Sequence, residues 1–97
     1  VKPSSKNGSA GLAGIKLVAY YTGTDPNPSG ANAYPISTLT WILAYASGNG
    51  ANTPALKKTF AYMLSNKAQS QAPSLGYVPL PNRIRKISLA AVQKIAD

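Results

Sequence analysis

The sequence predicts an α/β fold in which two strands precede two or three amphipathic helices. Two observations predict it. β-Branched and aromatic residues concentrate in residues 15–22 and 34–46, which is typical of strands. Apolar residues recur at helical spacing in residues 53–64 and 82–95, which is typical of helices packed on one face. The length, 97 residues, allows one domain or part of one.

The first third of the chain is predicted to be a leader that carries little structure. Residues 1–14 are mostly Gly, Ser and Ala, a composition typical of a flexible linker. Their glycines precede a strand-like segment, whereas a phosphate-binding loop follows a strand, so a linker is the better interpretation. Residues 15–22 are then expected to form a short strand, and residues 23–33 a loop rich in Pro, Gly and Asn. Residues 1–31 are therefore treated as a flexible leader with one short strand and a Pro/Gly loop.

The segment 34–46 is predicted to be a long strand that is buried on both faces in its second half. Large apolar residues occupy alternate positions from Leu39 onward, and Ile42 and Ala44 occupy the opposite face. A two-stranded sheet is marginal in water. We therefore expect this strand to complete a sheet whose other strands lie outside these 97 residues, and residues 32–97 to be an incomplete domain.

The second half of the chain is predicted to be helical. Thr53 is expected to cap a helix, with Pro54 in its first turn, where the missing N–H of proline costs nothing. A second short helix is expected over residues 67–74, interrupted by Pro73. Residues 75–81 contain two prolines and are expected to be extended, before a last helix over residues 82–95.

The composition excludes most catalytic chemistry. The chain has no Cys and no His, and its only side-chain carboxylates are Asp25 and Asp97. Thiolate and imidazole catalysis, the common zinc sites and a clustered oxygen site for calcium or magnesium are therefore excluded. We expect a protein that is not an enzyme and that uses no metal and no cofactor.

The net charge of +8 keeps one alternative open, a small basic module that binds nucleic acid or another anionic surface. Its bases cluster at residues 57–58 and 83–86. Both clusters lie on the solvent side of predicted amphipathic helices, and charge runs of this kind are usually solvated faces. Nucleic acid is therefore not the expected partner. Similarly, Gly48 and Gly50 lack the rest of a dinucleotide-binding pattern and are interpreted as a polar turn.

Four stretches resemble the C-terminal segment of bacterial phosphate-binding proteins, the periplasmic receptors of the phosphate ABC importer, and most of all the cyanobacterial ones. They are AYPISTLTWILAY (33–45), ALKKTFAYMLSN (55–66), APSLGYVPLPNRI (72–84) and SLAAVQKI (88–95). The resemblance is continuous from about residue 32 to 95. It implies the C-terminal part of a two-lobed periplasmic-binding-protein fold of type II, which closes on phosphate between its lobes.

The resemblance also implies partners and a location. The partners are inorganic phosphate, bound through the rest of the protein, the remainder of that protein itself, and the membrane permease of the importer. The location is periplasmic or secreted. The chain starts at Val1 and contains no signal-type apolar stretch, so we expect it to be processed, truncated or cut out of something longer.

The resemblance transfers few site residues. The phosphate ligands of the family lie in regions that these 97 residues do not contain, so no phosphate ligand is assigned. Ser37, Thr38 and Thr40 are candidates for lining the cleft, although hydroxyls bonded to nearby backbone are the more common arrangement. Residues 34–36, Tyr34, Pro35 and Ile36, are predicted to be a crossing between lobes, with the proline tolerated at the start of a strand.

Overall fold

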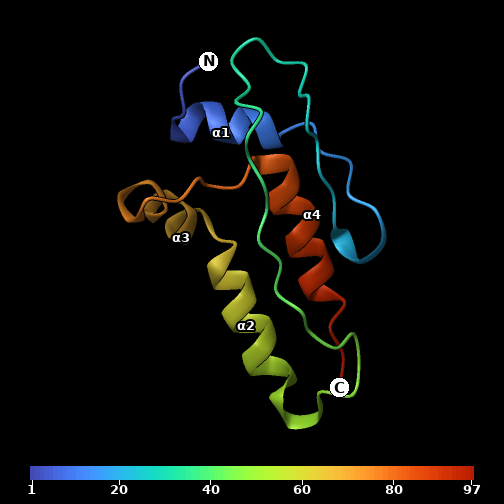
Figure 1. The fold of residues 1–97 in the computed structure, drawn as a ribbon. Coiled ribbons are helices and arrows are strands. Elements are labelled where there is room, and N and C mark those ends of the chain that lie inside the picture. The colour runs from blue at the N-terminus through green and yellow to red at the C-terminus, as the bar shows by residue number, and fades with distance from the viewer.

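The computed structural model describes residues 1–97 and consists of helices joined by extended chain (Figure 1). Four α-helices and three short 3₁₀ turns account for its regular structure, and it contains no β-strand. In chain order the elements are α1 (Ser5–Leu12), η1 (Ala19–Tyr21), η2 (Gly50–Asn52), α2 (Thr53–Met63), α3 (Asn66–Gln71), η3 (Pro73–Leu75) and α4 (Asn82–Gln93).

The predicted α/β fold is therefore wrong, and the missing element is the long strand over residues 34–46. This segment is extended, but no backbone amide in residues 35–46 donates a hydrogen bond to another part of the chain. A strand is defined by its ladder of backbone hydrogen bonds, which requires a neighbouring extended segment. The chain provides none, so residues 35–46, here called the strap, cross the molecule as unpaired chain (Figure 1).

The short strand predicted over residues 15–22 is also absent. The chain turns back within this segment, where Val18 N–H donates to Thr22 O at 2.8 Å and Tyr21 N–H donates to Val18 O at 2.9 Å. Tyr20 and Tyr21 both adopt a left-handed conformation with φ of 58°. That conformation breaks the extended chain and is unfavourable for aromatic residues, so β-propensity alone gave the wrong prediction here.

The predicted helices are present, with α2 and α4 forming an antiparallel pair (Figure 1). Pro54 lies in the first turn of α2, as the sequence predicts. The predicted short helix is α3, which ends just before Pro73. Ser65 caps its start by accepting a hydrogen bond from Ala68 N–H at 3.2 Å. Pro81 precedes α4, and its fixed φ makes it a suitable entry to the helix.

A helix occupies part of the leader that was expected to be flexible. The Ser4 side chain caps α1 by accepting a hydrogen bond from Asn7 N–H at 3.0 Å. Gly8 and Gly11 are buried because they allow other parts of the chain to approach the helix closely. At Gly11 the neighbour is the backbone carbonyl of Tyr34, so these glycines serve packing as well as flexibility.

The core is small and lies where α1, the strap and the start of α4 meet. Only 10 of the 97 residues are buried, and the central cluster consists of Leu12, Ile15 and Leu39. The prediction that the second half of residues 34–46 is buried on both faces is wrong, because Ile42 and Leu43 are 57% and 92% exposed. No neighbouring strands cover these side chains. The tertiary structure therefore depends on few apolar contacts.

Cationic side chains bond to the carbonyl ends of three helices. Arg83 of α4 donates to Ala13 O at 3.0 Å and to Ile15 O, just beyond the end of α1. Between α2 and α4 the arrangement is reciprocal. Lys57 of α2 donates to Gln93 O at 3.1 Å, and Arg85 of α4 lies 3.4 Å from Leu64 O. The last carbonyls of a helix lack intrahelical donors and carry partial negative charge, so cations stabilise them.

We predict that Gly11→Ala destabilises the fold. The new Cβ would collide with the carbonyl oxygen of Tyr34, which as backbone cannot move away independently. Overpacking of this kind costs about 1–3 kcal/mol. Urea denaturation followed by circular dichroism measures the loss. Gly14→Ala is the matched control, because nothing lies within 4 Å of a Cβ at that position; equal stability of the two variants would contradict the packing described for α1.

We also predict that Arg83→Met lowers the free energy of unfolding by about 1–2 kcal/mol, since hydrogen bonds from a charged donor are worth a little more than neutral ones and Arg83 is exposed. The free energy of unfolding of Arg83→Lys should lie between those of Arg83→Met and the unsubstituted chain, because an ammonium keeps the charge but lacks the planar guanidinium that donates two hydrogen bonds. The control is Lys86→Met on the same helix, which should change stability by less than about 0.5 kcal/mol. Thermal and urea unfolding of the three variants test the order.

Candidate functional site

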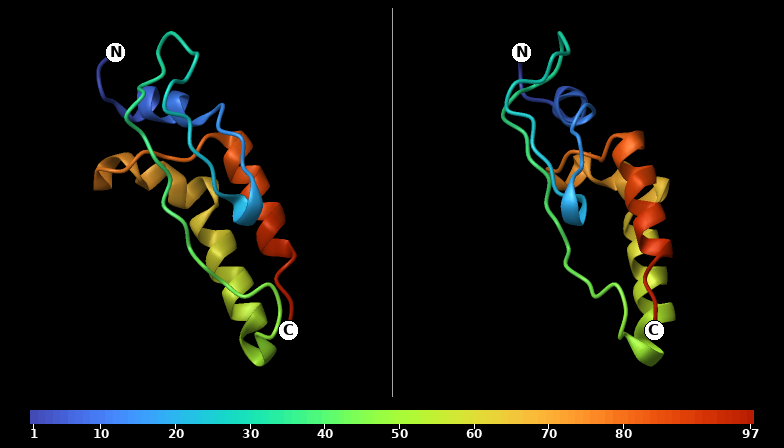
Figure 2. Two further views of the ribbon diagram at one scale, coloured as in Figure 1. Left: turned by 45° about the vertical axis from the view of Figure 1, so that its right-hand side comes forward. Right: turned by 90° about the vertical axis from the view of Figure 1, so that its right-hand side faces the viewer.

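The strap and the helix pair α2 and α4 border an apolar groove. Its volume is about 440 Å³, and 17 of its 20 lining residues are hydrophobic. The right-hand view of Figure 2 shows the strap on one side of the molecule and α2 and α4 on the other, and residues of all three segments line the groove. A groove of this size and polarity is typical of sites for apolar ligands or segments.

The strap is held at both ends by backbone contacts, and between them by the burial of Leu39 and the hydrogen bond of Trp41. At its start, Tyr34 N–H donates to Asn7 O at 2.9 Å. At its end, Ala96 N–H donates to Ala46 O at 2.9 Å. The Asn49 side-chain amide adds a bond to Ala96 O at 2.9 Å. These contacts hold the strap across the helices, while its central residues face the groove or the solvent.

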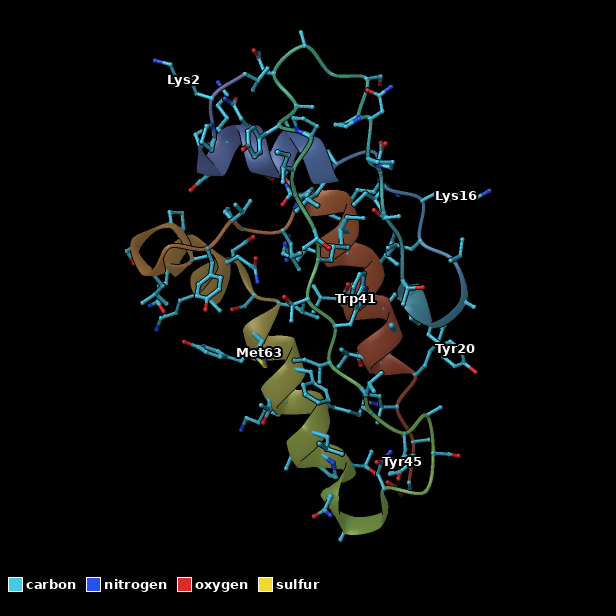
Figure 3. All side chains as sticks on the ribbon, in the orientation of Figure 1. Lys2, Lys16, Tyr20, Trp41, Tyr45 and Met63 are labelled. Carbon is cyan, nitrogen blue, oxygen red and sulfur yellow. The ribbon has the colours of Figure 1, made fainter.

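Trp41 is the central aromatic residue of the strap (Figure 3). Its indole N–H donates to Tyr21 O at 3.2 Å, which ties the strap to the turn at residues 19–21. The ring is 42% exposed and lines both the groove and a neighbouring shallow hollow. It is also the only tryptophan in the chain, so its fluorescence reports on this region alone.

The three predicted cleft residues do not form one site. Ser37 Oγ donates to Tyr34 O at 3.1 Å, and Thr38 Oγ1 lies 3.4 Å from Leu39 O, so both hydroxyls face nearby backbone. Thr40 lines the groove. The structure therefore brings one of the three candidates to a concave surface and leaves their assignment as phosphate-cleft residues a prediction.

The predicted crossing lies at the start of the strap. Tyr34 is half-buried and contacts α1 through its backbone, whereas Pro35 and Ile36 are exposed. Ile36 is 81% exposed, which is unusual for a large apolar side chain in so small a molecule. The role of these residues as a crossing between lobes stays a prediction.

A second, shallower hollow of about 460 Å³ lies beside the strap. It is lined by Lys16, Thr22, Thr24 and Trp41 among others, so it has one cation and two hydroxyls. The Thr22 hydroxyl already donates to Ala19 O at 2.9 Å. One exposed lysine and one uncommitted hydroxyl do not make a preorganised anion site, which needs several converging donors.

The structure gathers no group of three His, Cys, Asp or Glu side chains that could hold a metal ion. None of its helices has the length and apolar character needed to cross a membrane. Chemically, the arrangement can bind apolar groups in the groove, and it can attract anions through its surface cations.

Sequence reasoning missed the groove. It treated the apolar residues of 39–46 as buried in a sheet, whereas in the structure they form one wall of an open space. The sequence signal that could have indicated the groove is the presence of two apolar stripes, one on α2 and one on α4. The periodicity of the sequence does not show which segment packs against these stripes, because that depends on the tertiary structure.

No protein-family model matches the chain. A weak similarity connects it with the phosphate-binding protein PstS of the archaeon Methanocaldococcus jannaschii, to which it is 28% identical over 116 aligned positions. The alignment covers all of this chain and 28% of that protein. The chain is thus distantly related to a phosphate-binding protein and spans little more than a quarter of its length.

Proposed function

We propose that this chain is a structural part of a phosphate-binding protein that delivers inorganic phosphate to an ABC-type importer. The observation that carries the proposal is the similarity to PstS, which extends over the whole chain. The four stretches that resemble the C-terminal segment of bacterial phosphate-binding proteins support the same function. The relative is archaeal, so the resemblance to cyanobacterial members stays a prediction.

In this proposal the 97 residues support the receptor and do not hold the anion. Tight phosphate binding needs several charged and neutral donors that converge with fixed geometry. Here Lys57, Arg83 and Arg85 are directed to backbone carbonyls at helix ends. These contacts also weaken the case for a basic module that binds nucleic acid, because both predicted basic clusters, residues 57–58 and 83–86, use some of their donors within the fold.

The proposal includes a location and partners. A receptor of this kind works outside the cytoplasmic membrane, in the periplasm or as a secreted protein, and passes phosphate to a membrane permease. The remainder of the receptor would supply the phosphate ligands. In this proposal the protein binds phosphate and releases it without chemical change.

We predict that the isolated 97-residue chain has no tight phosphate site. Its net charge of +8 attracts phosphate only weakly, and salt screens that attraction, with a screening length near 8 Å at about 0.15 M. Isothermal titration with phosphate at this ionic strength should therefore show no saturable binding. A submicromolar site that persists at high salt would show that these residues contain the ligands themselves.

The receptor role is tested on the natural protein. Antibodies raised against the 97-residue chain should recover, from phosphate-starved cells of the source organism, a polypeptide larger than 10.1 kDa that binds radiolabelled phosphate in a saturable manner. Sulfate at equal concentration should not displace the label. Recovery of a protein that fails to bind phosphate would overturn the proposed function, whatever the isolated chain does in titration.

A further inference from the structure

The loop that joins the strap to α2 lies beside the end of the chain, and hydrogen bonds connect the two (Figure 1). Ala96 N–H donates to Ala46 O at 2.9 Å, and Gly48 N–H donates to Asp97 O at 2.7 Å. These bonds, together with those of the Asn49 side chain, are here called the clasp. None of the residues 45–49 and 95–97 is buried, so hydrogen bonds and not apolar packing hold the clasp together.

The Asn49 side-chain amide makes two of the hydrogen bonds of the clasp. Its Nδ2 donates to Tyr45 O at 3.0 Å and to Ala96 O at 2.9 Å. Both partners are carbonyl oxygens, which only accept hydrogen bonds. An ionised carboxylate also only accepts, so in the place of this amide it would lose both bonds and repel both carbonyls. The clasp therefore requires an amide at this position.

Asn49 is followed by Gly50, and asparagine loses its side-chain amide most readily when glycine follows it. In that reaction the backbone nitrogen of the next residue attacks the side-chain carbonyl carbon, and glycine has no side chain to hinder the approach. Gly50 is exposed, has φ of 56°, and has no atom within 4 Å of the position of a Cβ. Its N–H donates no hydrogen bond within the chain, so the attacking nitrogen is free.

The chain contains a second pair of this kind, Asn7 and Gly8, which the fold protects. Gly8 is buried in α1, and its N–H donates to Ser4 O at 2.8 Å. Attack by this nitrogen requires that its hydrogen bond and the surrounding helical turn open first. The structure therefore distinguishes two chemically identical pairs by the state of the attacking nitrogen, which is committed in α1 and free at Gly50.

We propose that Asn49 is a site of spontaneous deamidation and that this reaction opens the clasp. Gly50 N forms a bond to Asn49 Cγ while the bond from Cγ to Nδ2 breaks, and Nδ2 leaves as ammonia with the proton that Gly50 N gives up. Water then hydrolyses the cyclic imide. Cleavage between Cγ and Gly50 N gives aspartate, and cleavage between the main-chain carbonyl carbon and Gly50 N gives isoaspartate.

Either product lacks the amide donor of the clasp and carries a new negative charge. The change is expected to be local, because the burial of Leu39 and the hydrogen bond of Trp41 hold the rest of the strap independently of the clasp. The reaction is intramolecular and consumes only water, so it requires no bound ligand and does not depend on the phosphate role.

The site is tested by incubating the 97-residue chain at mildly alkaline pH and mapping the deamidated positions by mass spectrometry. Trypsin separates the two pairs into the peptides 7–16 and 17–57, and fragmentation then locates the altered residue. Asn49 should react at least about fivefold faster than Asn7, the factor that corresponds to one net hydrogen bond on the attacking nitrogen. The rate should rise with pH, because Gly50 N must lose its proton. Equal rates at the two positions would overturn the proposal.

The restraint that the clasp places on Asn49 is tested by a chain that ends at Ile95. This truncation removes the Ala96 acceptor and both backbone bonds of the clasp. Deamidation of Asn49 should become about fivefold faster, because its side chain is freed from one bond, while the rate at Asn7 stays the same. An unchanged rate at Asn49 would contradict the link between the reaction and the clasp.

The consequence is tested with Asn49→Asp, which reproduces one product. Hydrogen exchange of the Gly48 and Ala96 amides, followed by NMR, should become at least about tenfold faster, since two hydrogen bonds are lost. Asn52→Asp is the matched control, because it adds the same charge in the same loop and the Asn52 side chain donates no hydrogen bond. Equal exchange in the two variants would show that charge alone acts. If Asn49→Asp unfolds the chain, the comparison of Asn49 with Asn7 still decides the proposal.

Discussion

The contacts between cationic side chains and helix-end carbonyls hold this structure together where its core does not. With 10 buried residues, apolar packing alone is a weak constraint on how the helices are placed. Arg83 joins α4 to the end of α1, while Lys57 and Arg85 join α2 and α4 at both ends of the antiparallel pair. The chain has ten bases and two acids, so its cationic side chains find few carboxylates. The partially negative carbonyl groups at helix ends accept their hydrogen bonds instead. The arrangement has a cost, because Arg85 Nε remains buried without a partner.

The strap follows from the placement of the helices. It can cross the helix pair only because α1 anchors its start near Gly11 and the chain after α4 anchors its end at Ala46. Between these anchors its backbone amides are left to water, and its large side chains are divided between the groove and the surface. Among the side chains of the strap, only Trp41 donates a hydrogen bond to a distant part of the chain, at Tyr21 O. The groove is therefore defined by the end contacts of the strap and by the packing of Leu39 against Leu12 and Ile15.

The bases that contact helix ends and the apolar groove are separate features of the chain. A structural segment of a receptor has its bases committed to its own helices, which leaves few donors for an anion of the size of phosphate. The apolar groove lies on a different part of the molecule and depends on the distance between the strap and the helix pair.

The sequence by itself determined the helices of the second half, the interruption near Pro73 and the scarcity of catalytic side chains. Those features depend on local spacing, on the missing amide of proline and on composition, which act without distant partners. Only the tertiary structure decided the rest. Residues 34–46 have the composition of a strand, but a strand exists only where a neighbour supplies hydrogen bonds, and none is present in this chain. In the same way α1 forms in a Gly-rich leader because its glycines permit contacts with Tyr34 and Val78, which no local pattern specifies.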